Sequence, residues 1–248
     1  MNEAIPGIPT FRSDPLPAER RPDSHEEVVL RGGDRVLIRP VQREDAELER
    51  RFIEALSPES RRFRFFETLL TPSPALLDQL TVLDPATDVA FVAVVAEGKR
   101  ERAVGVGRFS ADAAGHDCEF ALTVAEEWQK KGLASHLMTR LIAVAKARGI
   151  VRMHSSDAAH NSKMRDFATH LHLSREADPD DATLVVYSVD LTKDRSQFID
   201  LTLAPEVADW RRSLGCSESE LRNAVATVGN SAARVRGYLT GQTGRAVD

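Results

Sequence analysis

The stretch Gln129-Lys130-Lys131-Gly132-Leu133-Ala134 has the composition of a helix start that could bind an anion. The first turn of a helix has unpaired backbone N–H groups and a partial positive charge, which together bind groups such as a pyrophosphate. Gly132 would let the backbone approach the anion without a Cβ clash, and the small side chain of Ala134 adds little bulk to the first turn of the helix. Lys130 and Lys131 would add counter-charge. The alternative is an ordinary helix start whose lysines lie on a solvated face. Periodicity alone does not distinguish an anion-binding helix start from this ordinary one.

The sequence offers little for metal or thiol chemistry. Its two cysteines, Cys118 and Cys216, are far apart and form no CxxC motif, which argues against a zinc cluster or a disulfide framework. His170 and His172 lie two residues apart on an expected helix, so they point to different faces and make a poor ligand pair. We therefore expect no metal cofactor.

Bulk composition narrows the class of partner. A hydrophobic content of 42% and a charged content of 29% are typical of a globular protein. The net charge of −5 and the lack of a basic run argue against nucleic acid as a partner. The longest apolar stretch, 89–96, is too short to span a bilayer, and the N-terminus has no signal-peptide core. We expect a cytoplasmic protein whose partners are small molecules or proteins.

Several elements must form to place the 129–134 stretch at a helix start. Apolar patterning predicts a hairpin or kinked strand at 27–39 that turns at Gly32-Gly33-Asp34. Further strands are expected at 89–96, 102–110, 115–124, 150–155 and 183–191. Helical spacing and capping signals predict helices that begin at 45, 57, 74, 132 and 161. This order of elements requires a mixed sheet.

Composition also divides the chain into segments. Residues 1–26 are rich in proline and charge and are expected to be a disordered leader, followed by a main domain at 27–192 and a linker at 193–204. Residues 205–242 are expected to form a small three-helix domain, and 243–248 a disordered tail. The pattern Ser217-Glu218-Ser219-Glu220 predicts a capping box, and Gly229-Asn230-Ser231 ends one helix and starts the next.

The wider pattern around the 129–134 stretch supports a family assignment. The motif Q-x-x-G-x-A at a helix start, preceded by a strand, resembles the acetyl-CoA-binding motif of the GNAT superfamily of N-acetyltransferases. Leu37-Ile38-Arg39-Pro40, Glu44-Asp45 and the segment 56–66 resemble the acceptor side of GNAT domains in bacterial protein lysine acetyltransferases of the Pat type. This resemblance covers 28–191 and implies an α/β (α+β) fold with a mostly antiparallel central sheet flanked by helices. The tail resembles a small helical family of unknown function.

The resemblance also implies where the coenzyme would bind. The strand before the motif should splay from its neighbour, and the pantetheine arm of the coenzyme should insert there as a further strand would. The residues expected to contact coenzyme are Leu122, Thr123, Val124, Gln129, Lys130, Lys131, Gly132, Leu133, Ala134, Ser135 and Asn161. A simple helix N-cap is the alternative role for Asn161.

Glu119 stands where many relatives keep a general base. An amine acceptor arrives as an ammonium ion and must lose a proton before it attacks, so a carboxylate has a definite task there. The alternative is an exposed strand glutamate paired with an arginine. Ala168 replaces the tyrosine that some relatives use as an acid for the departing thiolate, as is common in Pat-type relatives.

The implied function is transfer of an acetyl group from acetyl-CoA directly to an amine, most readily a lysine on a protein. A small-molecule amine is the nearest alternative acceptor. A non-catalytic acyl-CoA-binding module and a scaffold acting through its helical tail are the other classes. The oligomeric state cannot be inferred from the sequence.

Overall fold

The computed structural model describes residues 25–65, 71–98, 100–192, 199, 201 and 204–243. Most of the expected leader, linker and terminal tail lies outside these residues. The described chain contains the strands β1 (Glu26–Val29), β2 (Arg35–Pro40), β3 (Asp88–Glu97), β4 (Arg100–Ala111), β5 (Asp117–Val124), β6 (Arg152–Ala158), β7 (Ser174–Ala177) and β8 (Leu184–Asp190). Its helices are α1 (Ala46–Ala55), α2 (Pro58–Phe65), α3 (Pro74–Thr81), α4 (Leu133–Ala147), α5 (Ser162–His170), α6 (Ala204–Leu214), α7 (Glu218–Val228) and α8 (Ala232–Thr243).

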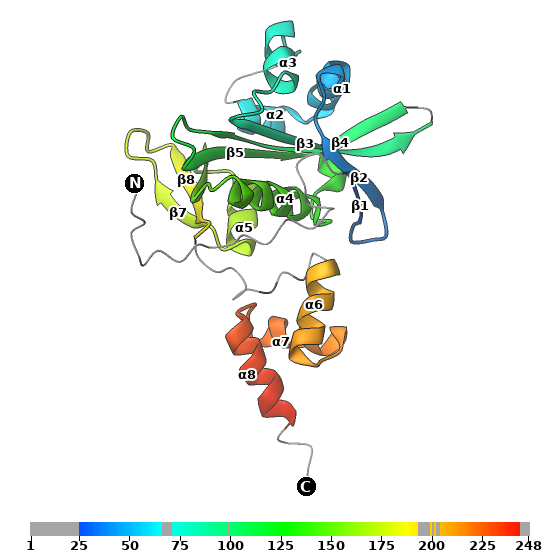
Figure 1. The fold of residues 1–248 in the computed structure, drawn as a ribbon, viewed down its shortest axis with the longest axis vertical. Helices are drawn as coiled ribbons and strands as arrows, with labels where there is room; N and C mark the ends of the chain where they lie inside the picture. Colours follow the sequence, from blue (N-terminus) through cyan, green and yellow to red (C-terminus); the bar gives the residue numbers. More distant parts are fainter. Residues whose placement is uncertain are drawn as a thin grey trace, which may run out of the picture.

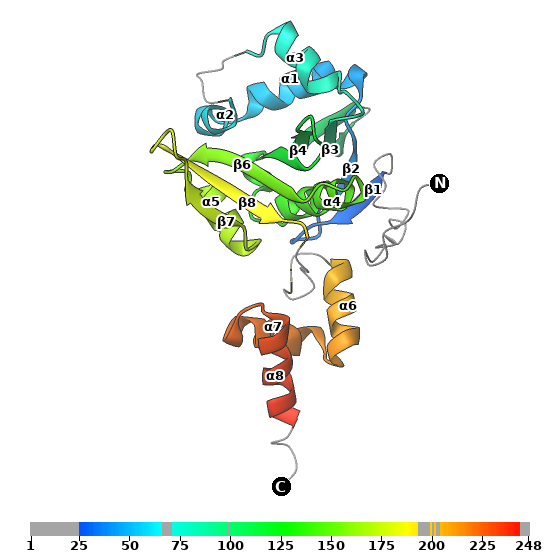
Figure 2. The same ribbon diagram turned by 60° about the vertical axis from the view of Figure 1, so that its left-hand side comes forward.

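The strands form one eight-stranded sheet in the order β1-β2-β3-β4-β5-β6-β8-β7. Neighbouring strands are antiparallel except β5 and β6, which are parallel. The predicted mixed, mostly antiparallel sheet is confirmed. Helices α1, α2 and α3 cover one face of this sheet, and α4 and α5 cover the other (Figure 1, Figure 2). Among the described residues, none of the helices combines the length and the apolar composition that crossing a membrane requires.

Each face of the sheet has its own apolar core. Alternate residues of β3 go to opposite cores, Phe91 to the α4 side and Val92 to the α1 side, because successive strand residues point to opposite faces. Helix α4 contributes Leu137 and Leu141 to the first core, and α1 contributes Phe52 to the second. The continuous apolar run at 89–96 is therefore explained by a central strand buried on both sides.

Two glycines of β4 set how closely α4 approaches the sheet. A Cβ atom at Gly107 would lie 2.8 Å from Leu122 Cδ2 and 3.2 Å from Leu137 Cβ. A Cβ atom at Gly105 would lie 3.0 Å from Leu133 Cδ2, in the first turn of the helix. Since neither position has room for a side chain, the start of α4 is held directly against β4.

Charged side chains join β2 to the start of α1. Arg39 donates to both carboxylate oxygens of Asp45 at 2.8 Å, and also to Glu101 at 2.6 Å. Asp45 additionally accepts from the backbone N–H of Gln42 at 2.7 Å, which closes a capping box at the 3₁₀ turn before α1. Arg39 and Asp45 are both buried, so this pair fixes α1 over the sheet.

The predictions for two strands were incomplete or wrong. The strand expected at 150–155 is β6, which begins two residues later, at Arg152, and ends at Ala158. It begins later because the end of α4 turns through Gly149 (φ +80°) and the Ile150 N–H still bonds to the Ala145 carbonyl. The short edge strand β7 was not predicted. Its four residues are all exposed, so they show no apolar alternation.

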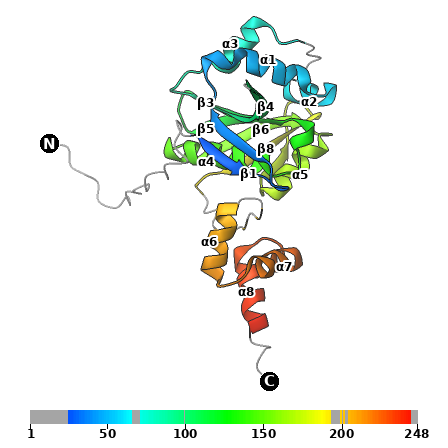
Figure 3. The same cartoon turned by 90° about the vertical axis from the view of Figure 1, so that its right-hand side faces the viewer.

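The tail helices α6, α7 and α8 gather around an apolar cluster of their own, with Leu221 and Val235 fully buried. Helix α7 begins with the predicted capping box, in which Ser217 N–H donates to Glu220 Oε2 at 2.7 Å and Glu220 N–H donates to Ser217 Oγ at 3.3 Å. The three helices lie beyond the face covered by α4 and α5 (Figure 3). His172 and Asn230 connect the two parts, with 2.8 Å between Nε2 and Oδ1.

Candidate active site

The expected coenzyme-binding motif lies on the loop and helix that follow β5. A 3₁₀ turn at Glu126–Trp128 joins the strand to α4, and the side-chain amide of Gln129 donates to the Val124 carbonyl at 2.9 Å. The Ala125 N–H donates to the Val104 carbonyl of β4 at 3.0 Å. These bonds hold the loop against the end of the sheet. The motif glutamine therefore shapes the loop that leads to the helix start.

The first turn of α4 has backbone N–H groups that could bind an anion. Gly132 is the N-cap residue, with φ +94°, and has no side chain that could accept from the first helical N–H groups. The first intrahelical bond is donated by His136, so Leu133, Ala134 and Ser135 keep N–H groups without an intrahelical partner. Lys130 also has a positive φ of 61°, and such left-handed residues in a loop turn backbone N–H groups into anion-binding concavities.

The side chains of this motif differ in what they can offer a ligand. Lys130 is exposed, whereas Lys131 bonds to Asp34 Oδ2 at 2.9 Å and lies over the Trp128 ring. Leu133 and Ser135 are buried, so they can contribute to a surface ligand through backbone N–H groups rather than side chains. Much of the positive charge expected from Lys131 is thus already compensated within the protein.

The sheet opens beside this motif. Strands β5 and β6 pair in register from Asp117↔Arg152 to Glu119↔His154, and the pairing stops there. Beyond that point β5 continues to pair with β4, and β6 with β8. Residues 120–124 therefore have a second edge that faces away from β4 and is not paired with β6, as the predicted splay requires. Leu122, Thr123 and Val124 all lie on this segment.

Glu119 stands at the last register pair before the opening and is exposed. Residues level with one another in a parallel pair share a face of the sheet, which places His154 beside it. His154 Nδ1 lies 2.8 Å from Asp117 Oδ1, and Arg152 bonds to the other oxygen of that carboxylate at 2.9 Å. Glu119 is thus flanked by an already paired Asp–His–Arg group.

Asn161 is the N-cap of α5. Its Oδ1 accepts from the Met164 N–H at 3.1 Å, and its Nδ2 donates to both Asp157 oxygens at 3.0 and 3.1 Å. Burial raises the pKa of Asp157, while the bonds from Asn161 and the Ala158 N–H oppose that rise. The structural role of Asn161 as a cap is therefore present, and contact with coenzyme would add to it.

Two residues near the site are withdrawn into the core. Ala168, which we expect at the place of the tyrosine found in some relatives, is a buried residue of α5. Cys118, directly before Glu119, is also buried, and burial raises the pKa of its thiol to about 12. Because the thiolate is the nucleophilic form, Cys118 is a poor candidate for carrying an acyl group. No cluster of metal-ligating side chains occurs in the part of the chain that the structure describes.

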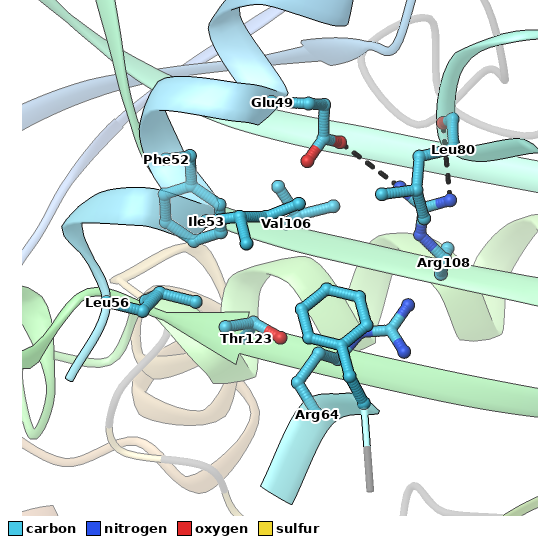
Figure 4. A pocket seen from close by; sticks show the side chains of 10 residues that line it. Glu49, Phe52, Ile53, Leu56, Arg64, Leu80, Val106, Arg108 and Thr123 are labelled. Carbon is cyan, nitrogen blue, oxygen red and sulfur yellow. Dashed lines mark hydrogen bonds and ion pairs between the residues drawn. The ribbon is translucent and has the colours of Figure 1, made fainter. Parts of the chain in front are cut away.

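A small pocket lies on the opposite face of the sheet from α4, under α1, α2 and α3 (Figure 4). It is lined by Glu49, Phe52, Ile53, Leu56, Arg64, Phe65, Leu80, Val106, Arg108 and Thr123. Thr123 and Glu119 point to this same face of β5, because they are four residues apart on one strand. The pocket and Glu119 therefore lie on the same face of the sheet.

The charged residues of this pocket were missed by the sequence analysis. Arg108 donates to Glu49 Oε1 at 3.1 Å and to the Leu80 carbonyl at 3.2 Å, although these residues are 59 and 28 positions apart. Two local signals were available. Glu49 lies one turn before Ile53 on the buried side of α1, and Arg108 interrupts the otherwise apolar stretch 103–109 of β4.

Two family models and several known proteins are similar to this chain. A family model described as the acetyltransferase (GNAT) family matches residues 51–172, and one described as a protein of unknown function (DUF3606) matches 192–240. The chain is 44% identical over 162 residues to the acetyltransferase PA5475 of Pseudomonas aeruginosa, which covers 65% of this chain and 87% of that protein. It is 31% identical over 147 residues to the acetyltransferase Pat of Mycolicibacterium smegmatis, covering 58% of this chain and 43% of that one.

The fold is likewise similar to a solved structure. The GNAT domain of S. lividans PAT superposes with a TM-score of 0.62 at 27% identity, covering 71% of this chain and 99% of that domain. The DUF3606 match at 192–240 includes α6, α7 and most of α8. The chain belongs to the GNAT family and is an acyl-CoA-dependent N-acetyltransferase with a DUF3606 region at its C-terminal side.

Proposed function

We propose that the chain transfers an acetyl group from acetyl-CoA directly to the side-chain amine of a protein lysine, with Glu119 as the general base. The observation that carries this proposal is the point at which β5 leaves β6. It comes immediately after Glu119, so an exposed carboxylate stands at the mouth of the opening. The open N-terminus of α4 follows the other end of the same strand.

The proposed coenzyme site uses backbone groups along the opening and the helix. The pyrophosphate would bind the N–H groups of Leu133, Ala134 and Ser135, with Lys130 adding charge. The pantetheine arm would bond to the edge of residues 122–124 that is not paired with β6, as a further strand does. A backbone N–H on that edge would also stabilise the oxyanion that develops on the acetyl carbonyl. Asn161, at the start of α5, would contact the arm.

The proposed chemistry requires one base and no covalent enzyme intermediate. Glu119 takes a proton from the acceptor ammonium, directly or through a water molecule, and the free amine attacks the acetyl carbonyl. The new C–N bond forms as the C–S bond breaks, and coenzyme A leaves as a thiolate that takes up a proton. The buried thiol of Cys118 supports direct transfer without an acyl-enzyme intermediate. Ala168 has no acidic side chain, so no protein acid at this position would protonate the departing thiolate.

The resemblance to Pat-type relatives supports a protein lysine as the acceptor. A small-molecule amine is the second candidate acceptor. A non-catalytic binding module would bind coenzyme and transfer nothing.

Release of free thiol from acetyl-CoA distinguishes these possibilities. The full chain would be incubated with acetyl-CoA and either small amines or lysine-bearing proteins, and acetylated products identified by mass spectrometry. Thiol release that depends on an amine is expected. Coenzyme binding without any acceptor-dependent release would leave only the binding-module alternative.

A further inference from the structure

His154 lies beside Glu119 where β5 and β6 stop pairing. The two residues form the last register pair of these parallel strands. Neighbouring strands are about 4.8 Å apart, so the side chains of such a pair leave the sheet next to each other. Both point away from α4, because Cys118 and Phe120 of β5 and Met153 of β6 belong to the core under that helix. The Glu119 carboxylate therefore has an imidazole as its neighbour on the same face of the sheet.

Asp117 determines which ring nitrogen of His154 can take up a proton. His154 Nδ1 lies 2.8 Å from Asp117 Oδ1, and both side chains are 29% exposed. Because an ionised carboxylate only accepts hydrogen bonds, the proton of the neutral imidazole stays on Nδ1, and Nε2 is the basic nitrogen. Arg152 donates to the other oxygen of Asp117 at 2.9 Å and holds that carboxylate in place. A carboxylate that orients an imidazole in this way prepares it to accept a proton.

A carboxylate alone is a poor final acceptor for a proton that comes from an amine. An aliphatic amine is a far stronger base than a carboxylate, and an imidazole lies between the two. Transfer of a proton from the acceptor ammonium to Glu119 is therefore uphill, and it becomes less so when the proton moves on to an imidazole. Removal of the proton also returns Glu119 to its ionised form, ready for the next acceptor.

We propose that His154 takes over the proton that Glu119 removes from the acceptor, with Asp117 holding the imidazole in the receptive tautomer. The proton moves from the ammonium nitrogen to the Glu119 carboxylate, then to His154 Nε2, directly or through a water molecule, and finally to solvent. The Nδ1–H stays bonded to Asp117 throughout. His154 touches no substrate and acts through Glu119. This relay rests on the acetyl transfer proposed above, because that reaction supplies the proton.

Steady-state kinetics of the full chain, followed as acceptor-dependent thiol release, test the relay. His154→Asn keeps a side-chain N–H that can donate to Asp117, but it has no basic nitrogen. It should lower kcat by about tenfold and leave KM for acetyl-CoA unchanged. This loss is smaller than that expected for Glu119→Gln, because water can still take the proton from Glu119.

Added imidazole gives a readout that a purely structural role would not change. It should raise kcat of His154→Asn in proportion to its concentration and leave native kcat unchanged, after subtraction of thiol release without acceptor. His116→Asn is the matched control, because it removes an exposed histidine just before β5, and it should match the native chain. Asp117→Asn keeps the imidazole without fixing its tautomer, so it should lower kcat by a smaller factor than His154→Asn.

A double variant shows whether His154 acts through Glu119. Adding His154→Asn to Glu119→Gln should lower kcat by less than about twofold more, since no proton then passes through residue 119, whereas independent effects would multiply. Native kcat in His154→Asn, a loss that imidazole does not reverse, or the same tenfold loss in both backgrounds would each overturn the relay. Absence of thiol release from the native chain with every amine would instead refute the transfer reaction itself.

Discussion

The side-chain amide of Gln129 donates to the Val124 carbonyl across the loop that joins β5 to α4, at 2.9 Å. The last strand residue expected to contact the pantetheine arm and the first motif residue are thus joined directly. The geometry of the strand end and of the helix start should therefore change together when this bond is lost.

Replacing Gln129 with Glu should weaken coenzyme A binding by about tenfold. The new carboxylate cannot donate to Val124, and it places negative charge beside the proposed pyrophosphate site. Titration calorimetry with coenzyme A measures the effect. Gln79→Glu adds the same charge on exposed α3 and should leave the dissociation constant unchanged. Unchanged affinity in Gln129→Glu would show that the loop does not depend on this bond.

Coenzyme A should raise the free energy of unfolding of the native chain, by about 2.7 kcal/mol at a hundredfold excess over its dissociation constant. Gly132→Glu should abolish this gain, because it adds bulk and negative charge at the helix start and strains a residue with φ +94°. Thermal unfolding with and without coenzyme gives the comparison. Gly115→Glu is the matched control, since Gly115 also has a positive φ and open space around it. A native chain that gains no stability from coenzyme A would contradict the proposed site.

If Glu119 is the general base, Glu119→Gln should keep coenzyme affinity and lower turnover by about 10²- to 10⁴-fold. The loss should shrink as pH rises, because more of the acceptor is then already a free amine. Thiol release measured against pH at one saturating acceptor concentration tests both points. Glu97→Gln, at an exposed end of β3, controls for loss of an acidic strand residue. Equal rates for Glu119→Gln and the native chain at every pH would show that Glu119 is not the general base.

The Arg39–Asp45 pair should make stability depend on pH. Burial alone would raise the pKa of Asp45, but the bonds from Arg39 and the Gln42 N–H hold it below its ordinary value. A carboxyl whose folded pKa is lowered stabilises the fold above its unfolded pKa of about 3.9, and that contribution is lost as pH falls through the folded pKa. Asp45→Asn should cost about 3 kcal/mol at pH 7, and its deficit relative to the native chain should narrow below about pH 4.

Denaturant unfolding at several pH values measures this deficit. Asp78→Asn on exposed α3 removes a carboxylate without a buried partner and should change stability little. A deficit of constant size from pH 7 to pH 3 would show that charge on Asp45 does not contribute.

Removing the three tail helices should leave coenzyme A binding largely intact. Their apolar cluster is separate from both cores of the sheet, and the proposed coenzyme contacts all precede β7. Calorimetry on the shortened chain, after circular dichroism confirms that it is folded, measures the affinity. His172→Ala in the full chain isolates the bond to Asn230. A folded but non-binding shortened chain would show that the tail supports the site.

Features with local sequence signals were predicted well. The hairpin at Gly32-Gly33, the start of α3 at Pro74 and the capping box of α7 each depend on residues close together in the chain. The helix start at Gly132 likewise follows from its immediate neighbours. These elements could be predicted because backbone geometry and capping are decided within a few residues.

Features that depend on tertiary contacts were not predicted. The pairing of Lys131 with Asp34 joins residues 97 positions apart, and it alters what that lysine can offer a ligand. The positions of Arg64 and Arg108 in one pocket depend on how α2 settles over β4. Periodicity in the sequence does not show which distant residues come together, so these contacts became visible only in the structure.

The short contact between β5 and β6 has a mechanical consequence. Strands β5 and β6 pair at only three positions, Asp117 to Glu119 of β5. This short pairing joins the half of the sheet that contains β1–β5 to the half that contains β6–β8. The apolar core under α4 and α5 draws side chains from both halves, including Phe120 and Tyr187, and must supply much of the remaining cohesion. A coenzyme arm bound in the opening would contact both halves of the sheet and hold them together. Substitutions in that core would then change how long coenzyme stays bound, even where they never touch it.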